Sequence, residues 1–126
     1  MVSVKYLMIA GLLAAQPSFA DDNTFSACME KSGGVTNSMV DCIGQETKSQ
    51  DVRLNKAYKE VMASVSSERK KQLQDAQRLW LKYREANCDF YYDPEGGTIA
   101  RVNANNCFLS TTEARAKELE GFNQEN

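Results

Sequence analysis

The stretch that decides the fold is residues 66–90, which read SSERKKQLQDAQRLWLKYREANCDF. Ser66-Ser67-Glu68 offers a helix cap and then an acid in the first turn, where negative charge favours the helix dipole. No proline interrupts the remaining residues, so we predict a helix over residues 67–90. One stripe with the three-to-four spacing of an amphipathic helix runs along it: Leu73, Ala76, Trp80, Tyr83 and Asn87, widened by Gln77, Arg84 and Cys88.

A second long helix is predicted just before this one. Apolar positions step by threes and fours from Val40 to Val65, and residues 36–38 (TNS) offer side-chain caps at its start. Gly44 lowers the stability of this helix by about 1 kcal/mol relative to alanine. A short helix is also predicted earlier in the chain, over residues 22–31. Because only two residues link the two long helices, we expect them to form an antiparallel hairpin.

Shorter elements are expected after the hairpin. Residues 93–97 (DPEGG) are a loop, residues 98–102 (TIARV) are a short β-prone segment, and a last short helix runs from Thr111 or Thr112 to about Glu120. The predicted fold class is therefore all-α. It is a small helical bundle built on a long antiparallel helix hairpin, with a disulfide-closed loop and a short C-terminal helix.

The first twenty residues are typical of a cleavable export signal. Lys5 gives a positive start, residues 6–15 (YLMIAGLLAA) are apolar, and Ser18-Phe19-Ala20 provides the small residues that precede a cut. A bilayer span needs about 20 apolar residues, twice the length of this run. We expect a signal peptide over residues 1–20 and a single domain over residues 21–126, without membrane insertion after cleavage.

The charge of this domain is mildly acidic. Cleavage removes one lysine and leaves 14 basic residues against 17 acidic ones. Nucleic-acid binding selects basic surfaces, so we expect no nucleic-acid partner. A basic protein partner fits better, because complementary charge steers two proteins together.

Four cysteines remain after cleavage, and their even number in a small exported protein predicts two disulfides. They are spaced 14, 46 and 19 residues apart, whereas zinc ligands usually come as closely spaced pairs, so we expect no metal site. Three pairings are possible. We predict Cys28–Cys42 and Cys88–Cys107, because the hairpin fills the middle gap. Each bridge closes a loop of roughly 15 to 20 residues and stabilises the domain by about 3 kcal/mol.

Catalytic chemistry is largely excluded. The chain has no histidine, which removes the commonest general base and the usual catalytic zinc ligand. Carboxylates such as Asp51, Glu60, Glu85 and Asp89 lie among lysines and arginines at helical spacing, as on a solvated helix face. We therefore expect a protein that is not an enzyme and needs no cofactor.

Two polar clusters are predicted to face each other across the hairpin. Buried polar groups need hydrogen-bond partners, so we expect Asp51 or Asn55 to bond with Gln77 or Arg84. We interpret the clusters as a structural network that sets the register of the hairpin, with ligand binding as the alternative. Its members are Asp51, Asn55, Tyr58, Gln77, Trp80 and Arg84.

The segment 91–106 is the candidate binding loop. A loop tethered by cysteines near both ends loses less entropy on binding, and tyrosine and arginine are common interface anchors. The alternative is a plain connector between two helices. The candidate contact residues are Tyr91, Tyr92, Gly96, Gly97, Thr98 and Arg101.

A joint motif spans most of the predicted domain. It consists of Cys42 with Glu46, Asp51-x-x-Leu54-Asn55-x-x-Tyr58, Gln77-x-x-Trp80-x-x-Tyr83-Arg84-Glu85-x-x-Cys88, Gly96-Gly97, Cys107, and Thr112-x-x-Arg115-x-x-x-Leu119. In this pattern the chain resembles the LprI-like family of small exported proteins, some of whose members are described as lysozyme inhibitors. The absence of a lipid-attachment cysteine makes it similar to the members that are not lipoproteins.

The resemblance implies a periplasmic protein that inhibits a cell-wall hydrolase by covering its active-site cleft, and lysozyme is the expected target. Lysozyme is basic, so an acidic inhibitor would be steered toward it. Its cleft holds two carboxylates that must reach the sugar, and Arg101, or another polar group of the segment 91–106, would be able to enter the cleft and pair with them. The alternatives are an accessory module that binds another envelope protein and an immunity protein against a secreted toxin. A carboxylate-based hydrolase is the least expected.

Overall fold

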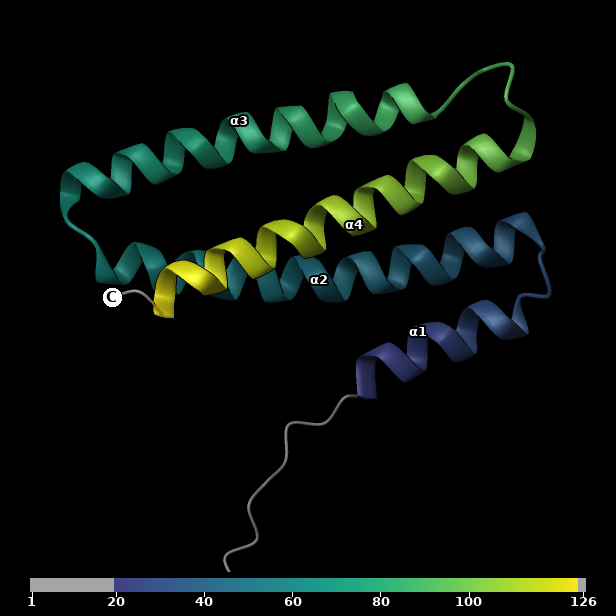
Figure 1. Cartoon of the computed structure of the whole chain (residues 1–126), viewed down its shortest axis with the longest axis horizontal. Coiled ribbons are helices and arrows are strands. Elements are labelled where there is room, and N and C mark those ends of the chain that lie inside the picture. Colours follow the sequence, from purple (N-terminus) through teal and green to yellow (C-terminus); the bar gives the residue numbers. More distant parts are fainter. Residues whose placement is uncertain (1–19, 125–126) are drawn as a thin grey trace, which may run out of the picture.

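The computed structural model describes residues 20–124, with side chains from residue 24 onward. This part of the chain forms four helices, α1 (Ala20–Lys31), α2 (Thr36–Ser64), α3 (Ser67–Tyr91) and α4 (Gly97–Gln124), and contains no strand (Figure 1). The predicted all-α class is confirmed. The predicted export signal lies outside the described residues, apart from Ala20.

The two long predicted helices are present with nearly the expected limits. The residue before α2 is Val35, and no side chain caps this helix, so the predicted caps at 36–38 are wrong. Residues 36–38 lie inside the first turn instead. At the start of α3, the hydroxyl of Ser66 accepts a hydrogen bond from the amide of Arg69, as expected of a serine cap.

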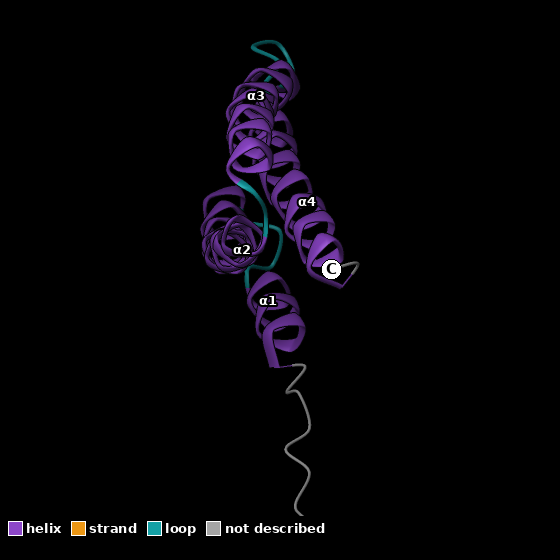
Figure 2. Cartoon of the chain, turned by 90° about the vertical axis from the view of Figure 1, so that its left-hand side faces the viewer, coloured by secondary structure: helices purple, strands orange, loops and turns teal. Residues whose placement is uncertain are grey.

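The helices α2 and α3 do not simply pack against each other as the predicted hairpin would. The helix α4 runs between α2 and α3, starting beside the end of α3 and finishing beside the end of α2 (Figures 1 and 2). It therefore packs against both of the other long helices. A short first helix, α1, lies against α2.

The core lies mainly between α2 and α4. One cluster joins Leu54 and Ala57 of α2 to Ala116 and Leu119 of α4. The other joins Ile43 of α2 to Val102 and Leu109 of α4. Fully burying one such leucine or isoleucine side chain stabilises the fold by about 1.5–3 kcal/mol, so these clusters fix α4 on α2.

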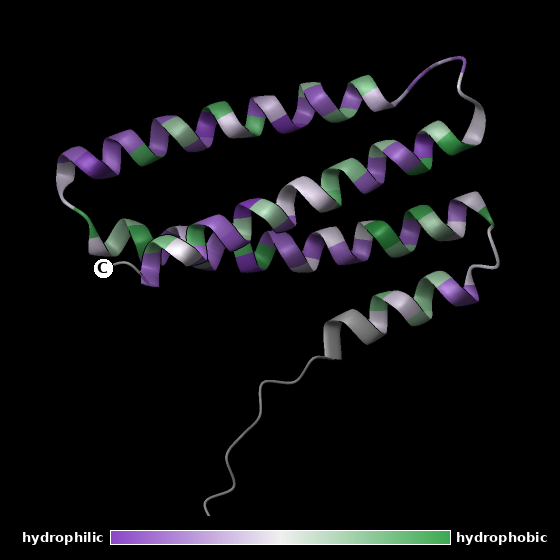
Figure 3. Ribbon diagram, in the orientation of Figure 1, coloured by the Kyte–Doolittle hydropathy of each residue, from purple (hydrophilic) through white to green (hydrophobic). Residues whose placement is uncertain are grey.

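The helix α3 is packed much less tightly. Cys88 is its one buried residue, and its first turns are hydrophilic (Figure 3). The predicted inward positions Ala76 and Tyr83 are exposed, because the stripe that turns toward α4 advances by four, three, four and three residues from Leu73. The half-buried members of that stripe are Leu73, Gln77, Trp80, Arg84 and Asn87.

The predictions of an extended segment at residues 98–102 and of a short last helix are wrong. α4 begins at Gly97 and is 28 residues long, so most of the segment 91–106 is helical. Ala100, Ala104 and Cys107 are buried at helical spacing, and Val102 packs in the cluster with Ile43. Packing against α2 therefore overrides the weak strand propensity of this stretch.

Both predicted disulfides are confirmed. Cys28 and Cys42 join α1 to α2 with an Sγ–Sγ distance of 1.97 Å. Cys88 and Cys107 join α3 to α4 at 2.10 Å. Among the described helices, none has both the length and the apolar content needed to cross a bilayer.

Candidate functional site

The end of the molecule where α3 meets α4 carries the residues predicted to bind a partner. We call residues 90–99 the tip. It comprises the last turn of α3, the connection 92–96 and the first residues of α4. Its large apolar side chains are exposed to solvent: Phe90 84%, Tyr91 50%, Tyr92 53% and Ile99 57%. Such a concentration of exposed apolar surface is typical of an interaction site.

The glycines of the tip are required by its turn. The amide of Gly96 donates to the carbonyl of Asp93 at 3.0 Å, and a Cβ on Gly96 would lie 2.9 Å from the Cβ of Ala100. Gly97 has a φ of +69°, a conformation that L side chains rarely adopt. The Gly96-Gly97 pair therefore shapes this connection, and its predicted contact with a partner stays a prediction.

The tip is attached to the body of the protein on two sides. The disulfide Cys88–Cys107 is attached to α3 two residues before the tip begins. On α4, the guanidinium of Arg101 donates to the side-chain carbonyl of Asn37 at 2.7 Å, which connects α4 to the start of α2. Arg101 and Thr98 are both exposed, so the structure places all six predicted contact residues at this end of the molecule.

The tip and the last turns of α3 before it are negatively charged. Between residues 85 and 100 the chain carries Glu85, Asp89, Asp93 and Glu95 and no lysine or arginine. All four carboxylate residues are exposed. The tip therefore combines exposed aromatic rings with acidic groups.

A polar network below the tip holds the three long helices together. Arg84 Nη1 donates to Asp51 Oδ1 at 3.2 Å and to Thr112 Oγ1 at 2.8 Å. Of the predicted pairings of Asp51 or Asn55 with Gln77 or Arg84, the one between Asp51 and Arg84 is thus present. The guanidinium also lies over two rings, with Cζ 4.8 Å from the centroid of Trp80 and 5.6 Å from that of Phe108, at cation–π distance.

The other predicted network residues point elsewhere. Gln77 Oε1 accepts a hydrogen bond at 3.0 Å from Arg115 Nε of α4, so it faces α4 instead of α2. Asn55 is exposed, and Tyr58 packs at the edge of the Leu54 cluster. Thus α4 supplies the partners that the hairpin alone was expected to supply.

The α4 members of this network, Phe108, Thr112 and Arg115, are not predicted by the local sequence pattern. That pattern favours a loop up to residue 106 and a last helix that begins near 112. A signal for the longer helix is nevertheless present in the motif Thr112-x-x-Arg115-x-x-x-Leu119, whose three residues are buried at helical spacing. Extending that spacing back to Cys107 and Ala104 would have predicted the long helix.

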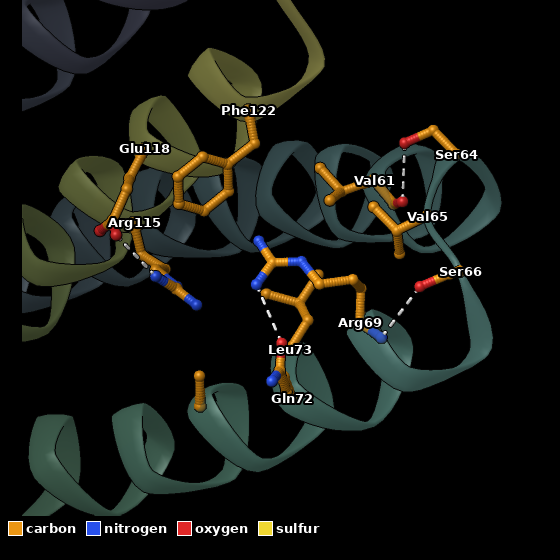
Figure 4. Close-up of a pocket in the computed structure, with 11 residues that line it drawn as sticks. Val61, Ser64, Val65, Ser66, Arg69, Gln72, Leu73, Arg115, Glu118 and Phe122 are labelled. Carbon is orange, nitrogen blue, oxygen red and sulfur yellow. Dashed lines mark hydrogen bonds and ion pairs between the residues drawn. The ribbon is translucent and has the colours of Figure 1, made fainter. Parts of the chain in front are cut away.

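A hollow lies at the opposite end of α3 from the tip, and we call it the groove. It has a volume of about 550 Å³ and lies between the end of α2, the first turns of α3 and the last turns of α4. Figure 4 shows the side chains of Arg69 and Arg115 directed into it from α3 and α4. No pattern in the sequence predicts this hollow.

Metal binding has no support in the described residues. They contain no group of three or more histidine, cysteine, aspartate or glutamate side chains that could hold an ion. All four cysteines are in disulfides, so none supplies a thiolate ligand or nucleophile.

Comparisons with known proteins give one family and one relative. The family model described as lysozyme inhibitor LprI matches residues 28–119. An uncharacterized protein of Rhizobium meliloti (strain 1021) is 27% identical over 92 residues, a match that covers 62% of this chain and 66% of the relative. No solved structure matches. The matched range includes the core, both disulfides, the tip and most of the groove.

Proposed function

Because the chain belongs to the LprI family, we propose that it is an exported, periplasmic inhibitor of lysozyme that covers the active-site cleft with the tip. The observation that carries this proposal is the run of exposed aromatic residues Phe90, Tyr91 and Tyr92 within a stretch of sequence that holds four exposed acidic residues and no base. Occlusion requires no chemistry by the inhibitor, in keeping with a chain that contains no histidine.

The composition of the tip suits a basic enzyme. Its carboxylates would steer a positively charged protein toward this end, an effect that falls as salt rises. Its tyrosines would supply most of the binding free energy, because aromatic residues dominate interface hot spots. A connection already fixed by the Cys88–Cys107 bridge and by the Gly96-Gly97 turn loses little entropy on binding.

The part played by Arg101 depends on its present hydrogen bond. One of its N–H groups already donates to the side-chain carbonyl of Asn37 at the start of α2. We propose that Arg101 orients the tip through α2 instead of entering the cleft, so that its removal weakens inhibition less than removal of the tyrosines. Thr98, exposed next to the double glycine, would lie at the edge of the contact.

The test is a lysozyme assay on cell walls with the protein purified with both disulfides formed. The double change Tyr91→Ala, Tyr92→Ala should weaken inhibition at least tenfold, about 1.4 kcal/mol, with the melting temperature unchanged because both rings are half exposed. Tyr83→Ala is the matched control, since Tyr83 is equally exposed on α3 but two turns from the tip.

Two results would refute the proposal in different ways. If the unaltered protein leaves lysozyme turnover unchanged, lysozyme is not the target. If the unaltered protein inhibits and the double tyrosine variant inhibits equally well, the tip is not the contact surface.

A further inference from the structure

We propose that the groove is a binding site for a single-chain anionic amphiphile, a fatty-acid-like molecule with a carboxylate head and an apolar chain. This site is separate from the tip and does not depend on the proposed inhibition of lysozyme. The family description and the relative say nothing of such a ligand.

The groove exists because α3 and α4 diverge. They are joined by Cys88–Cys107 at one end, whereas the two-residue link 65–66 ties the start of α3 to the end of α2. The first turns of α3 carry Arg69, Gln72 and Ala76 toward the gap, and none of these fills it with apolar volume. A space of about 550 Å³ remains, within the range of about 300–1,000 Å³ found for small-molecule sites.

The head-group site consists of two guanidinium groups. The side chain of Arg115 is 8% exposed, with Nε bonded to Gln77 and Nη1 to Glu118 at 3.0 Å. Arg69, on the opposite wall, bonds to Gln72 at 2.9 Å, and Figure 4 shows both guanidinium groups reaching into the space between the walls. A guanidinium has five donors in a planar fork, so both retain N–H groups for a carboxylate.

The local charge favours an anion. Two arginines line the groove against one glutamate, Glu118, and Glu118 already forms its ion pair with Arg115. A nearly buried cation gains more from an anionic partner than an exposed one does, because the surrounding dielectric is lower. The planar fork also matches a carboxylate in two parallel hydrogen bonds.

The remainder of the groove is apolar. Val61 and Val65 of α2, Leu73 of α3 and Phe122 of α4 line it, and Figure 4 shows Phe122 and the two valines lying along one side. Each methylene group buried against these side chains contributes about 0.8 kcal/mol. A neutral chain would receive this contribution too, but it would cover the remaining N–H groups of the two arginines without accepting hydrogen bonds from them, which is costly. An anionic head on an apolar chain satisfies both parts of the groove.

Tryptophan fluorescence can report on binding in the groove. Trp80 is the single tryptophan of the chain, and it packs with Leu73 against the Leu54 cluster next to the groove. Titrating the full, oxidised protein with dodecanoate, below the concentration at which it forms micelles, should change the Trp80 emission in a saturable way. Calorimetry should give one molecule bound per chain.

A neutral ligand and three variants of the protein test whether both parts of the groove take part in binding. Dodecyl maltoside, which is neutral, should bind at least tenfold more weakly than dodecanoate. Ala76→Phe, at an exposed position that lines the groove, should fill it and weaken dodecanoate binding at least tenfold. Arg69→Gln should weaken binding about tenfold, whereas Arg78→Gln, an exposed arginine of the same helix outside the groove lining, should not. Arg115 is left intact because its buried bonds also support the fold.

Several outcomes would overturn the proposal. They are equal affinity for dodecanoate and dodecyl maltoside, unchanged binding in Ala76→Phe, and equal losses in Arg69→Gln and Arg78→Gln. If dodecanoate does not bind but a peptide with a free apolar C-terminus does, the ligand of the groove is a peptide and the amphiphile proposal is wrong. Lysozyme inhibition by Ala76→Phe should stay intact, so failure of this site and failure of the tip are distinguishable.

Discussion

The two ends of α3 are built in opposite ways. At the tip end, α3 is tied to α4 by Cys88–Cys107 and by the network around Arg84, so the helices converge. At the other end, the nearest apolar residue of α3 is the half-buried Leu73, and the helices part to leave the groove. The difference shows that one end of a helix can be held by a disulfide while the space beside its other end stays unfilled. This is possible because α2 and α4 supply the core.

The charges of the two ends are also opposite. Residues 69–82 carry five lysines and arginines against one acid, whereas residues 85–99 carry four acids and no base. One end of α3 thus suits a basic protein and the other suits an anion. Substitutions at each end of the helix test this contrast, and they are given in order of decreasing cost to stability.

Removing the bridge at the tip end should destabilise the protein most. We expect Cys88→Ser with Cys107→Ser to lower the free energy of unfolding, measured in urea, by about 3 kcal/mol. Hydrogen exchange should rise at the tip and along α3, because no other α3 residue is buried. The matched control is Cys28→Ser with Cys42→Ser, which should cost a similar amount without raising exchange at the tip. Equal exchange at the tip in both variants would show that the Cys88–Cys107 bridge does not hold this end.

Removing the guanidinium below the tip should have an intermediate effect. Arg84→Ala leaves Asp51 without this partner and removes one bond from the buried hydroxyl of Thr112, so we expect a loss of about 2 kcal/mol in the free energy of unfolding. The exposed Arg78→Ala should change it by less than about 0.5 kcal/mol. Equal losses in the two variants would show that the network does not hold α3.

Truncation at the groove end should have a small effect. Leu73→Ala should cost about 1 kcal/mol, below the roughly 2–5 kcal/mol typical of a fully buried leucine, because Leu73 is half-buried and faces the groove. Urea unfolding measures this directly. A loss above about 3 kcal/mol would mean that α3 is packed as firmly here as at the disulfide.

The weakest effect concerns the ion pair between Arg53 of α2 and Glu120 of α4, which lies outside the groove lining. The pKa of Glu120 is lowered from its ordinary value of 4.5, chiefly by its hydrogen bond from Arg53 and despite its partial burial. A carboxylate with a depressed pKa stabilises the fold above pH 4.5, and this contribution is lost as the pH falls through the folded-state value. Both side chains are about a third exposed, so Glu120→Gln should cost less than about 1 kcal/mol at pH 7.

The pH dependence tests the sign of this contribution. The difference in unfolding free energy between the unaltered protein and Glu120→Gln should shrink as the pH falls below 4.5 and disappear in stronger acid. A difference that persists or grows in acid would show that the ion pair with Arg53 is not its origin.

Much of the scaffold was predictable from local pattern. The limits of α3 were predictable from its cap and helical period, and the disulfide pairing from the position of the hairpin. A polar bond between Asp51 or Asn55 of α2 and Gln77 or Arg84 of α3 was predictable from the two polar clusters, although which pair forms it was not. Each of these inferences depends on residues close in sequence or on one long-range pairing.

The position of α4 and the groove was not predictable in the same way. The stripes of α2 and α3 have the same period whether they face each other or a third helix, so their spacing cannot reveal that α4 lies between them. Residues 98–102 have strand propensity, and their helical state depends on the contact of Val102 with Ile43. The groove arises from the divergence of two helices, which no single stretch of sequence encodes.

Hydrogen exchange on a mixture of the oxidised protein with excess lysozyme would show which end of α3 meets the enzyme. We predict slower exchange for the backbone amides of residues 90–99, with residues 66–76 beside the groove unchanged. Slower exchange confined to 66–76, or no change at the tip while lysozyme is inhibited, would contradict the assignment of the tip as the inhibitory surface.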